Sequence, residues 1–205
     1  MFLPPALKDA HIMPIWKGGD RAKPAHYRHV ALTPHLSKIV ERVIRQHLVD
    51  FLEAKGLMDA TQYGARGGRS TLSQLLEQHD YVLRMLEDGD NLDAVYLDFE
   101  KAFDKVDHPL LLRKIEALGI RGDLGRWLGS FLYGRRQATK VGGALSSWAR
   151  VVSGVPHGTV RGPLLFLIFI SDHGSQALLL KYVDDTKILW RIGGQAGVAG
   201  TGRNS

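Results

Sequence analysis

The segment LLLKYVDDTKILW, residues 178–190, places two adjacent aspartates between two apolar runs. Leu178–Tyr182 and Lys187–Arg191 have the composition of strands, with Asp184 and Asp185 at the bend between them. Two unpaired carboxylates held close together repel by roughly 1 kcal/mol in water and more near a protein surface. A divalent cation reverses that repulsion, because Mg²⁺ prefers carboxylate and phosphate oxygens. The alternative is an exposed Asp-Asp turn, since Asp is a common turn residue.

A third carboxylate follows another apolar run, in the segment VYLDFEKAFDKVDH at residues 95–108. Leu92–Leu97 is expected to form a buried strand that ends at Asp98, at a sheet edge where the aspartate pair could meet it. Two-metal catalysis of phosphoryl transfer requires such a trio. The competing interpretation is a strand followed by an acidic loop, in which Asp104 and Asp107 cap a helix that opens at Pro109.

The other predicted elements alternate between strands and helices. Expected strands are His11–Trp16 with Val30–Leu32 as a hairpin, and Arg136–Val141 with Trp148–Val152. Expected helices run from Pro34, capped by Thr33, to Gly56, from Ser70 to Gly89, from Pro109 to Leu118, from Gly122 to Tyr133, and after a turn at Gly154–Gly158. The first two helices each carry an apolar stripe that we expect to be buried: Leu36, Ile39, Val40, Val43 and Ile44, and Leu72, Leu75, Leu76, Val82, Leu83 and Leu86. This order predicts an α+β fold with an antiparallel sheet backed by helices.

Composition narrows the class of protein. Of the 205 residues, 44% are hydrophobic, which is enough for a globular core. The chain has a net positive charge, with 27 Lys and Arg against 21 Asp and Glu, and this favours an acidic partner such as nucleic acid. Absent cysteines exclude disulfides and thiolate metal sites. The longest apolar run, Leu164–Ile170, is too short to span a membrane, and no signal peptide is evident, so we expect an intracellular protein, nuclear or cytoplasmic. Residues 193–205 are expected to be a glycine-rich disordered tail.

Together with residues 153–166, SGVPHGTVRGPLLF, the two aspartate segments resemble the core motifs of non-LTR (LINE-type) retrotransposon reverse transcriptases. Residues 14–20, 27–33 and 62–71 resemble the fingers motifs of the same family, so the resemblance covers about residues 10–190. It implies a right-hand polymerase palm with partial fingers and an absent thumb. Fingers are expected at residues 1–90 and the palm at 91–192.

The resemblance also implies roles for individual residues. Asp98, Asp184 and Asp185 would be catalytic and, with the main-chain carbonyl of Phe99, would hold two Mg²⁺ or Mn²⁺ ions. An RNA template, a DNA primer and dNTPs are the implied partners. Contacts to the dNTP would come from Lys17, Arg28, Phe103 and His157, and contacts to template or primer from Arg66, Arg69, Gly154, Gly158 and Tyr182. The alternative interpretations are that Phe103 is a core residue and that the four cations are solvated surface charge.

The sequence departs from the family pattern at a few positions. His157 stands where a glutamine is usual, Arg161 where an apolar residue is usual, and His29 where a proline is usual. None of these changes removes an expected metal ligand. Two functions follow as hypotheses: a truncated RNA-directed DNA polymerase domain, or an inactive remnant that at most binds nucleic acid. A reading frame that makes no stable protein is a third possibility.

Overall fold

The computed structural model describes residues 3–156, 159, 162–171 and 177–192. It divides into two compact units. The first combines Met1–Asp59 with Glu100–Asp172, and the second combines Ala60–Phe99 with His173–Ser205. Each unit therefore joins segments that are far apart in the sequence.

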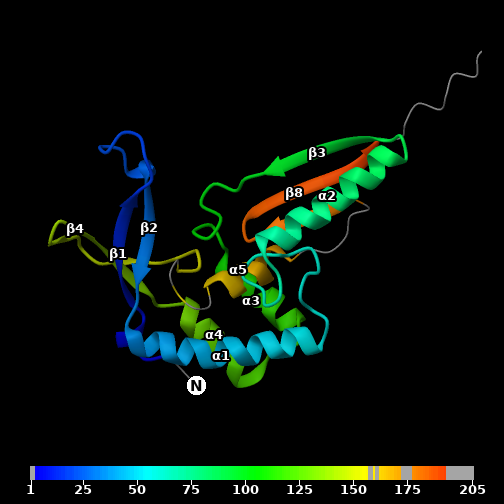
Figure 1. Cartoon of the computed structure of the whole chain (residues 1–205). Coiled ribbons are helices and arrows are strands. Elements are labelled where there is room, and N and C mark those ends of the chain that lie inside the picture. Colours follow the sequence, from blue (N-terminus) through cyan, green and yellow to red (C-terminus); the bar gives the residue numbers. More distant parts are fainter. Residues whose placement is uncertain (1–2, 157–158, 160–161, 172–176, 193–205) are drawn as a thin grey trace, which may run out of the picture. The chain divides into compact units, whose positions relative to one another are not determined.

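The second unit is built on a three-stranded antiparallel sheet in the order β3-β8-β7. Its strands are β3 (Asn91–Leu97), β7 (Leu178–Tyr182) and β8 (Asp185–Ile192). Helix α2 (Thr71–Glu87) lies along one face of this sheet (Figure 1). Tyr63, Leu180 and Leu189 form a small core there, with Tyr81 and Val82 of α2 packed against it. The strands around the aspartate pair are confirmed, although β8 begins two residues earlier than expected. The strand expected at Leu92–Leu97 also forms, as β3, but all of its residues except the half-buried Leu92 are exposed, so its predicted burial is wrong.

Helix α2 begins as expected but turns the opposite side to the sheet. Ser70 accepts a hydrogen bond from the Ser73 amide in a capping box. Its buried residue is Gln74, whereas Leu72, Leu75, Leu76, Leu83 and Leu86 are exposed, Leu76 to 61%. The predicted burial of this stripe is therefore wrong, apart from the half-buried Val82. An apolar stripe at helical spacing identifies a face, but the neighbours decide whether that face is covered.

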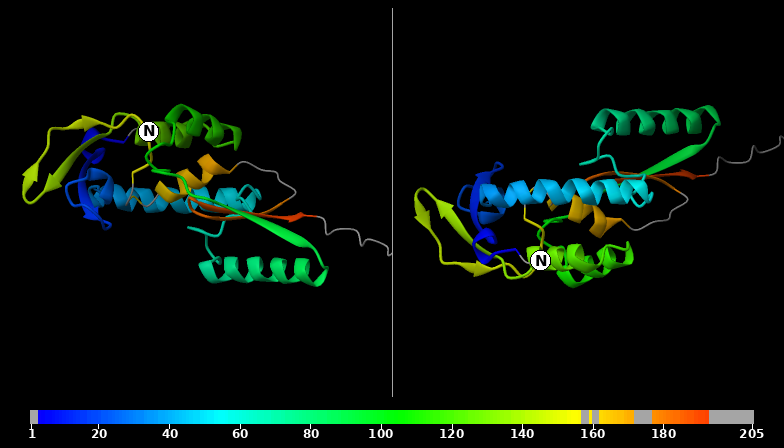
Figure 2. Two further views of the ribbon diagram at one scale, coloured as in Figure 1. Left: turned by 90° about the horizontal axis from the view of Figure 1, so that it is seen from above. Right: turned by 90° about the horizontal axis from the view of Figure 1, so that it is seen from below.

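The first unit contains a mixed five-stranded sheet in the order β2-β1-β4-β5, with β6 also paired to β4. Strands β1 (Asp9–Trp16) and β2 (Tyr27–Leu32) form the expected hairpin, and the short 3₁₀ helices Pro5–Leu7 and Pro24–His26 precede them. β4 (Arg136–Val141) pairs antiparallel with β5 (Ala144–Leu145) and β6 (Ala149–Arg150), which replace the longer strand expected at Trp148–Val152. β4 also runs parallel to β1, a pairing that the sequence did not predict, and the two hairpins lie side by side (Figure 2).

Four α-helices complete the first unit: α1 (His35–Ala54), α3 (His108–Ala117), α4 (Gly122–Leu132) and α5 (Gly162–Ile170). Asp107 caps α3 as expected, accepting a hydrogen bond from the Leu110 amide at 2.7 Å. Packing among α3, α4 and α5 forms a core that includes Leu111, Ile115, Trp127, Leu128, Phe131, Leu165 and Phe166.

Helix α1 differs from its prediction in two ways. Its N-cap is Pro34 and no side chain caps it, so the predicted Thr33 cap is wrong. The helix buries Ser37, Glu41, Leu48 and Leu52, while Leu36, Ile39 and Val43 are exposed, Leu36 to 59%. Ile44 and Val40 are half-buried. Its apolar stripe, like that of α2, is largely uncovered.

The α+β class with sheets backed by helices is thus confirmed. The boundaries of fingers and palm at residues 1–90 and 91–192 stay a prediction. Residues 193–205, expected to be a disordered tail, lie outside the described residues. Within the described part of the chain, no helix has the length and hydrophobicity needed to cross a membrane.

Candidate active site

The register of the three-stranded sheet brings the aspartates to one end. Leu97, the last residue of β3, pairs with Thr186, so the antiparallel register continues to Asp98 opposite Asp185. Asp185 in turn pairs with Tyr182, which leaves Val183 and Asp184 as a two-residue hairpin loop. The sheet edge predicted from the sequence therefore exists, and it carries Asp98, Asp184 and Asp185.

The loop between β7 and β8 has a strained backbone. Val183 has φ of 58°, in the left-handed region that a β-branched residue rarely adopts. Two-residue hairpin loops require a positive φ, because only then does the turn match the twist of the strands. At Val183 this conformation costs about 1–3 kcal/mol, so neighbouring contacts must hold it.

Gln62 supplies those contacts. Its side chain is 2% exposed, and its Oε1 accepts hydrogen bonds from the amides of Val183 at 2.9 Å and Gly64 at 2.8 Å. Its Nε2 donates to the Val183 carbonyl at 3.3 Å. The Tyr63 amide donates to the Lys181 carbonyl, and the Lys181 amide donates to the Thr61 carbonyl, both at 2.8 Å. The segment at residues 61–64 therefore holds the strained turn from its β7 side.

Gly64 allows this close approach. A β-carbon at position 64 would lie 2.6 Å from both the amide nitrogen and Cγ2 of Val183, a distance that would force one segment to move. The sequence indicated a family motif at these positions but did not assign Gln62 or Gly64 to the site. No local pattern could have found this contact, because the partner of Gln62 lies 121 residues away.

The carboxylates match the chemistry of a hard cation, although their side chains do not converge. Asp98 and Asp185 are exposed and Asp184 is half-buried. Among residues 3–156, 159, 162–171 and 177–192, no three His, Asp or Glu side chains are grouped closely enough to hold a metal ion. Mg²⁺ often binds proteins through only one or two carboxylates, with water and substrate phosphates as its other ligands. The carboxylate oxygens of the three aspartates could serve as such ligands. Phe99, whose carbonyl was the fourth expected ligand, directly follows Asp98 and is exposed.

The expected triphosphate cations lie in the first unit, at one end of the β1–β2 hairpin. Arg28 pairs with Ile15, and Lys17 follows Trp16, which pairs with Tyr27. Both side chains are exposed. The hairpin thus places Lys17 and Arg28 near each other on neighbouring strands. Their role in binding the triphosphate stays a prediction.

Phe103 and Gly154, also in the first unit, belong to one tightly bonded loop pair. Phe103 is buried and stacked on Phe166, with ring centroids 4.3 Å apart. Gly154 has φ of 86°, and a β-carbon there would lie 2.9 Å from the main-chain oxygens of Phe103 and Asp104. Its amide donates to the Val106 carbonyl at 2.8 Å. The close approach that makes glycine necessary at position 154 is therefore to the chain itself.

The remaining expected contacts are divided between described and undescribed residues. Arg69 lies over the ring of Tyr63, 4.5 Å from its centroid, and Arg66 is half-buried. Tyr182 packs at the margin of the small core of the second unit. His157 and Gly158 lie outside the described residues.

Comparison with known proteins shows the family of the chain. A family model for "Reverse transcriptase (RNA-dependent DNA polymerase)" matches residues 15–193. The chain is 33% identical over 181 residues to the probable RNA-directed DNA polymerase from transposon X-element of Drosophila melanogaster, covering 85% of this chain and 20% of the relative. It is 33% identical to the RNA-directed DNA polymerase from mobile element jockey of the same organism, covering 92% of this chain and 22% of the relative. The chain thus spans about a fifth of the length of these relatives.

Solved telomerase structures share the fold. Apo telomerase from Candida tropicalis, truncated from its C-terminal domain, superposes with a TM-score of 0.65 at 15% identity, covering 91% of this chain and 44% of that one. Candida albicans telomerase in complex with a fragment of telomeric RNA gives 0.61 at 14% identity, covering 89% and 38%. The chain therefore belongs to the reverse transcriptase family, and the relatives that it matches are polymerases of non-LTR retrotransposons.

Proposed function

We propose that this chain is the part of an RNA-directed DNA polymerase that carries the catalytic carboxylates and adds dNTPs to a primer 3′-hydroxyl on an RNA template. The observation that carries the proposal is the sheet register, which brings Asp98, Asp184 and Asp185 to one end of β3, β7 and β8 within a chain matched by the reverse transcriptase family.

The chain's own residues would act by holding and aligning the reactants. Asp98 and Asp184, with Asp185 as their acidic neighbour, would bind the divalent cations, which when bound neutralise phosphate charge and activate the attacking hydroxyl. Gln62 keeps the turn that carries Asp184 in one conformation. Alignment of this kind supplies much of the rate in phosphoryl transfer, because the reaction requires little other chemistry from the protein.

Lys17 and Arg28 would grip the triphosphate, one as a point charge and the other as a forked donor. Phe103 would lie beneath the sugar and exclude a 2′-hydroxyl, which makes deoxynucleotides the substrate. Arg66 and Arg69 would contact backbone phosphates of the template, with affinity that falls as salt rises.

Primer extension on an RNA template with Mg²⁺ or Mn²⁺ tests the proposal. The parent chain is expected to incorporate dNTPs, and Asp184→Asn and Asp98→Asn to lose most of this signal. Asp93→Asn is the matched control, because Asp93 is an exposed aspartate inside β3, away from the carboxylate end. Equal incorporation by the parent and Asp184→Asn, or an equal loss in the Asp93 variant, would sink the proposal.

A second function, nucleic-acid binding without catalysis, is favoured by the excess of 27 Lys and Arg over 21 Asp and Glu. It predicts binding of RNA and DNA that is indifferent to sequence and steeply weakened by salt, without incorporation. Fluorescence anisotropy across a salt series measures the binding. Template-dependent synthesis by the purified chain would rule out this function as the whole account.

A further inference from the structure

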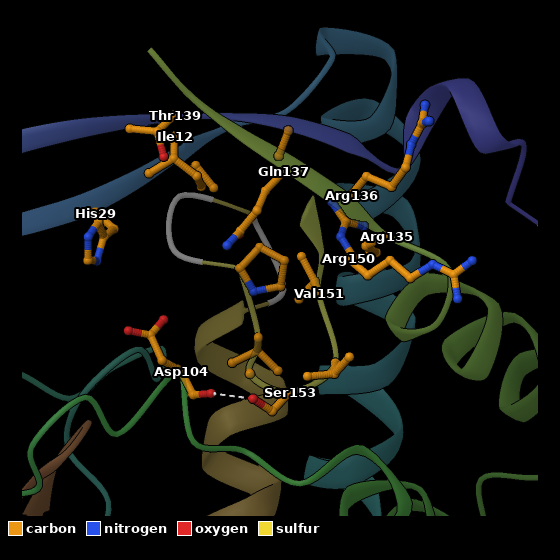
Figure 3. Close-up of a pocket in the computed structure, with 16 residues that line it drawn as sticks. Ile12, His29, Asp104, Arg135, Arg136, Gln137, Thr139, Arg150, Val151 and Ser153 are labelled. Carbon is orange, nitrogen blue, oxygen red and sulfur yellow. Dashed lines mark hydrogen bonds between the residues drawn. The ribbon is translucent and has the colours of Figure 1, made fainter. Parts of the chain in front are cut away.

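The first unit contains a half-open cavity of about 340 Å³ that the proposed polymerase chemistry does not use. Its apolar floor is the small core of Ala10, Ile12 and Ala31. Three arginines, Arg135, Arg136 and Arg150, line the cavity, as do polar side chains from His29, Asp104, Gln137, Thr139 and Ser153. Figure 3 shows the arginines gathered on one side, with His29 and Asp104 on the other and Gln137 between them.

The cavity lies on the opposite face of the sheet from Arg28. Side chains of neighbouring residues in a strand point to opposite faces. His29 and Ala31 line the cavity, so Arg28, between Tyr27 and His29 in β2, points away from it. A ligand in this cavity is therefore separate from the triphosphate grip expected of Arg28.

Arg135 is a buried cation whose hydrogen-bonding capacity is only partly satisfied. It is 2% exposed, its Nη1 donates to the Phe131 carbonyl at 3.3 Å, and its guanidinium lies 4.9 Å from the Phe131 ring. Its Nη2 is buried and has no hydrogen-bond partner among the described residues. A buried charged donor without a partner is costly, and an oxyanion in the cavity is the kind of group that would complete it.

The other two arginines differ in how far they are neutralised. Arg136 is paired with Asp9 through two hydrogen bonds of 3.0 and 2.7 Å. Arg150 is exposed and forms no ion pair with any described residue. Near Arg135, burial lowers the pKa of Lys8, and the charge of Arg135 lowers it further, so positive charge is concentrated here. Two carboxylates partly offset this positive charge: Asp104 lies in the cavity wall, and while burial lowers the pKa of Arg135, the charge of Glu41 opposes that lowering.

We propose that the arginine side of this cavity is an oxyanion site in which Arg135 and Arg150 bind a phosphate group. A phosphate could come from the backbone of a single-stranded nucleic acid or from a free polyphosphate. Both sources present oxygens that a guanidinium binds through two parallel hydrogen bonds. A second hollow of about 600 Å³ is lined by the same three arginines with Tyr133, Gly134, Val151 and Val152.

The test uses the full chain and two probes, a fluorescent single-stranded oligonucleotide and inorganic tripolyphosphate. Arg150→Gln is the main variant, because Arg150 is exposed and its loss should leave the fold intact. Arg135→Gln is the second, provided that its unfolding transition remains cooperative. Arg113→Gln, an exposed arginine on α3 outside the cavity, is the matched control.

Arg150→Gln is expected to weaken binding about tenfold, as the loss of one charge-assisted contact does. If a strand phosphate binds, the oligonucleotide loses affinity and its salt slope falls by about one. If a free polyphosphate binds, the loss appears with tripolyphosphate, measured by calorimetry. Unchanged affinity for both probes in Arg150→Gln, or an equal loss in Arg113→Gln, overturns the proposal. Neither readout depends on polymerase activity, so failure of the proposed function would leave this test unaffected.

Discussion

Replacing Gln62 by alanine should loosen the turn that carries Asp184. Gln62→Ala removes two hydrogen bonds of 2.8 and 2.9 Å and a longer one of 3.3 Å, and it leaves the Val183 and Gly64 amides without their acceptor. Each such bond contributes about 1 kcal/mol, so the free energy of unfolding should fall by roughly 2–3 kcal/mol. For a chain of this size the loss corresponds to a drop in Tm of about 4–12 °C.

Gln74→Ala is the matched control for this effect. Gln74 also belongs to the second unit and is only 2% exposed, but its Nε2 has no hydrogen-bond partner among the described residues. The two variants remove the same atoms, so the difference between their effects isolates the bonds to the turn. We expect Gln74→Ala to cost about 1 kcal/mol or less.

Thermal unfolding gives the stabilities, and hydrogen exchange gives the local effect. The Val183 amide should exchange much faster in Gln62→Ala than in the parent, because its acceptor is gone, and should be unchanged in Gln74→Ala. Equal losses of Tm in the two variants, together with unaltered protection of Val183, would refute the account of Gln62 as the residue that holds the turn.

Three further predictions concern the packing and the electrostatics. Gly64→Ala should lower the free energy of unfolding by about 1–3 kcal/mol, because the new β-carbon would lie 2.6 Å from atoms of Val183 in the turn. Gly67→Ala is the control: position 67 has open space around it, so thermal unfolding should show no loss of stability. Leu180→Ala should lower the free energy of unfolding by about 2–5 kcal/mol and Leu76→Ala by less than about 0.5 kcal/mol, because only Leu180 is buried. Urea titration measures both values, and a larger loss in Leu76→Ala would contradict the burial described for these two side chains. Asp9→Asn should destabilise the chain at neutral pH, because hydrogen bonding to its arginine partner lowers the pKa of Asp9. That contribution is present above the ordinary carboxyl pKa of about 4 and is lost as pH falls through the lowered value, so the parent and the variant should converge in acid, and a pH-independent difference would count against it.

Local patterns predicted most of the elements and the position of the aspartates. Alternating and apolar runs located β3, β7 and β8, and the polar residue before each apolar run located the caps at Ser70 and Asp107. These features depend on residues within a few positions of one another, which is why sequence periodicity reports them.

Long-range features were beyond the sequence patterns. The apolar stripes of α1 and α2 were correctly located on those helices, but a stripe does not show what packs against it, and both are largely exposed. The parallel pairing of β1 with β4 joins residues more than 120 positions apart, as does the contact of Gln62 with Val183. No local propensity encodes such partners, because the chain between them can take many paths.

The strained turn explains why the segment at residues 61–64 and the aspartate pair should be treated as one structural element. Valine is a poor residue for a φ of 58°, so the hairpin alone would not keep Val183 there. The conformation persists because a buried glutamine holds the loop amide and carbonyl, and because a glycine leaves room for the valine side chain. Asp184 is the other residue of this loop, so its position depends on the same contacts. A substitution at residues 61–64 should therefore disturb the carboxylate end of the sheet, although those residues carry no carboxylate themselves.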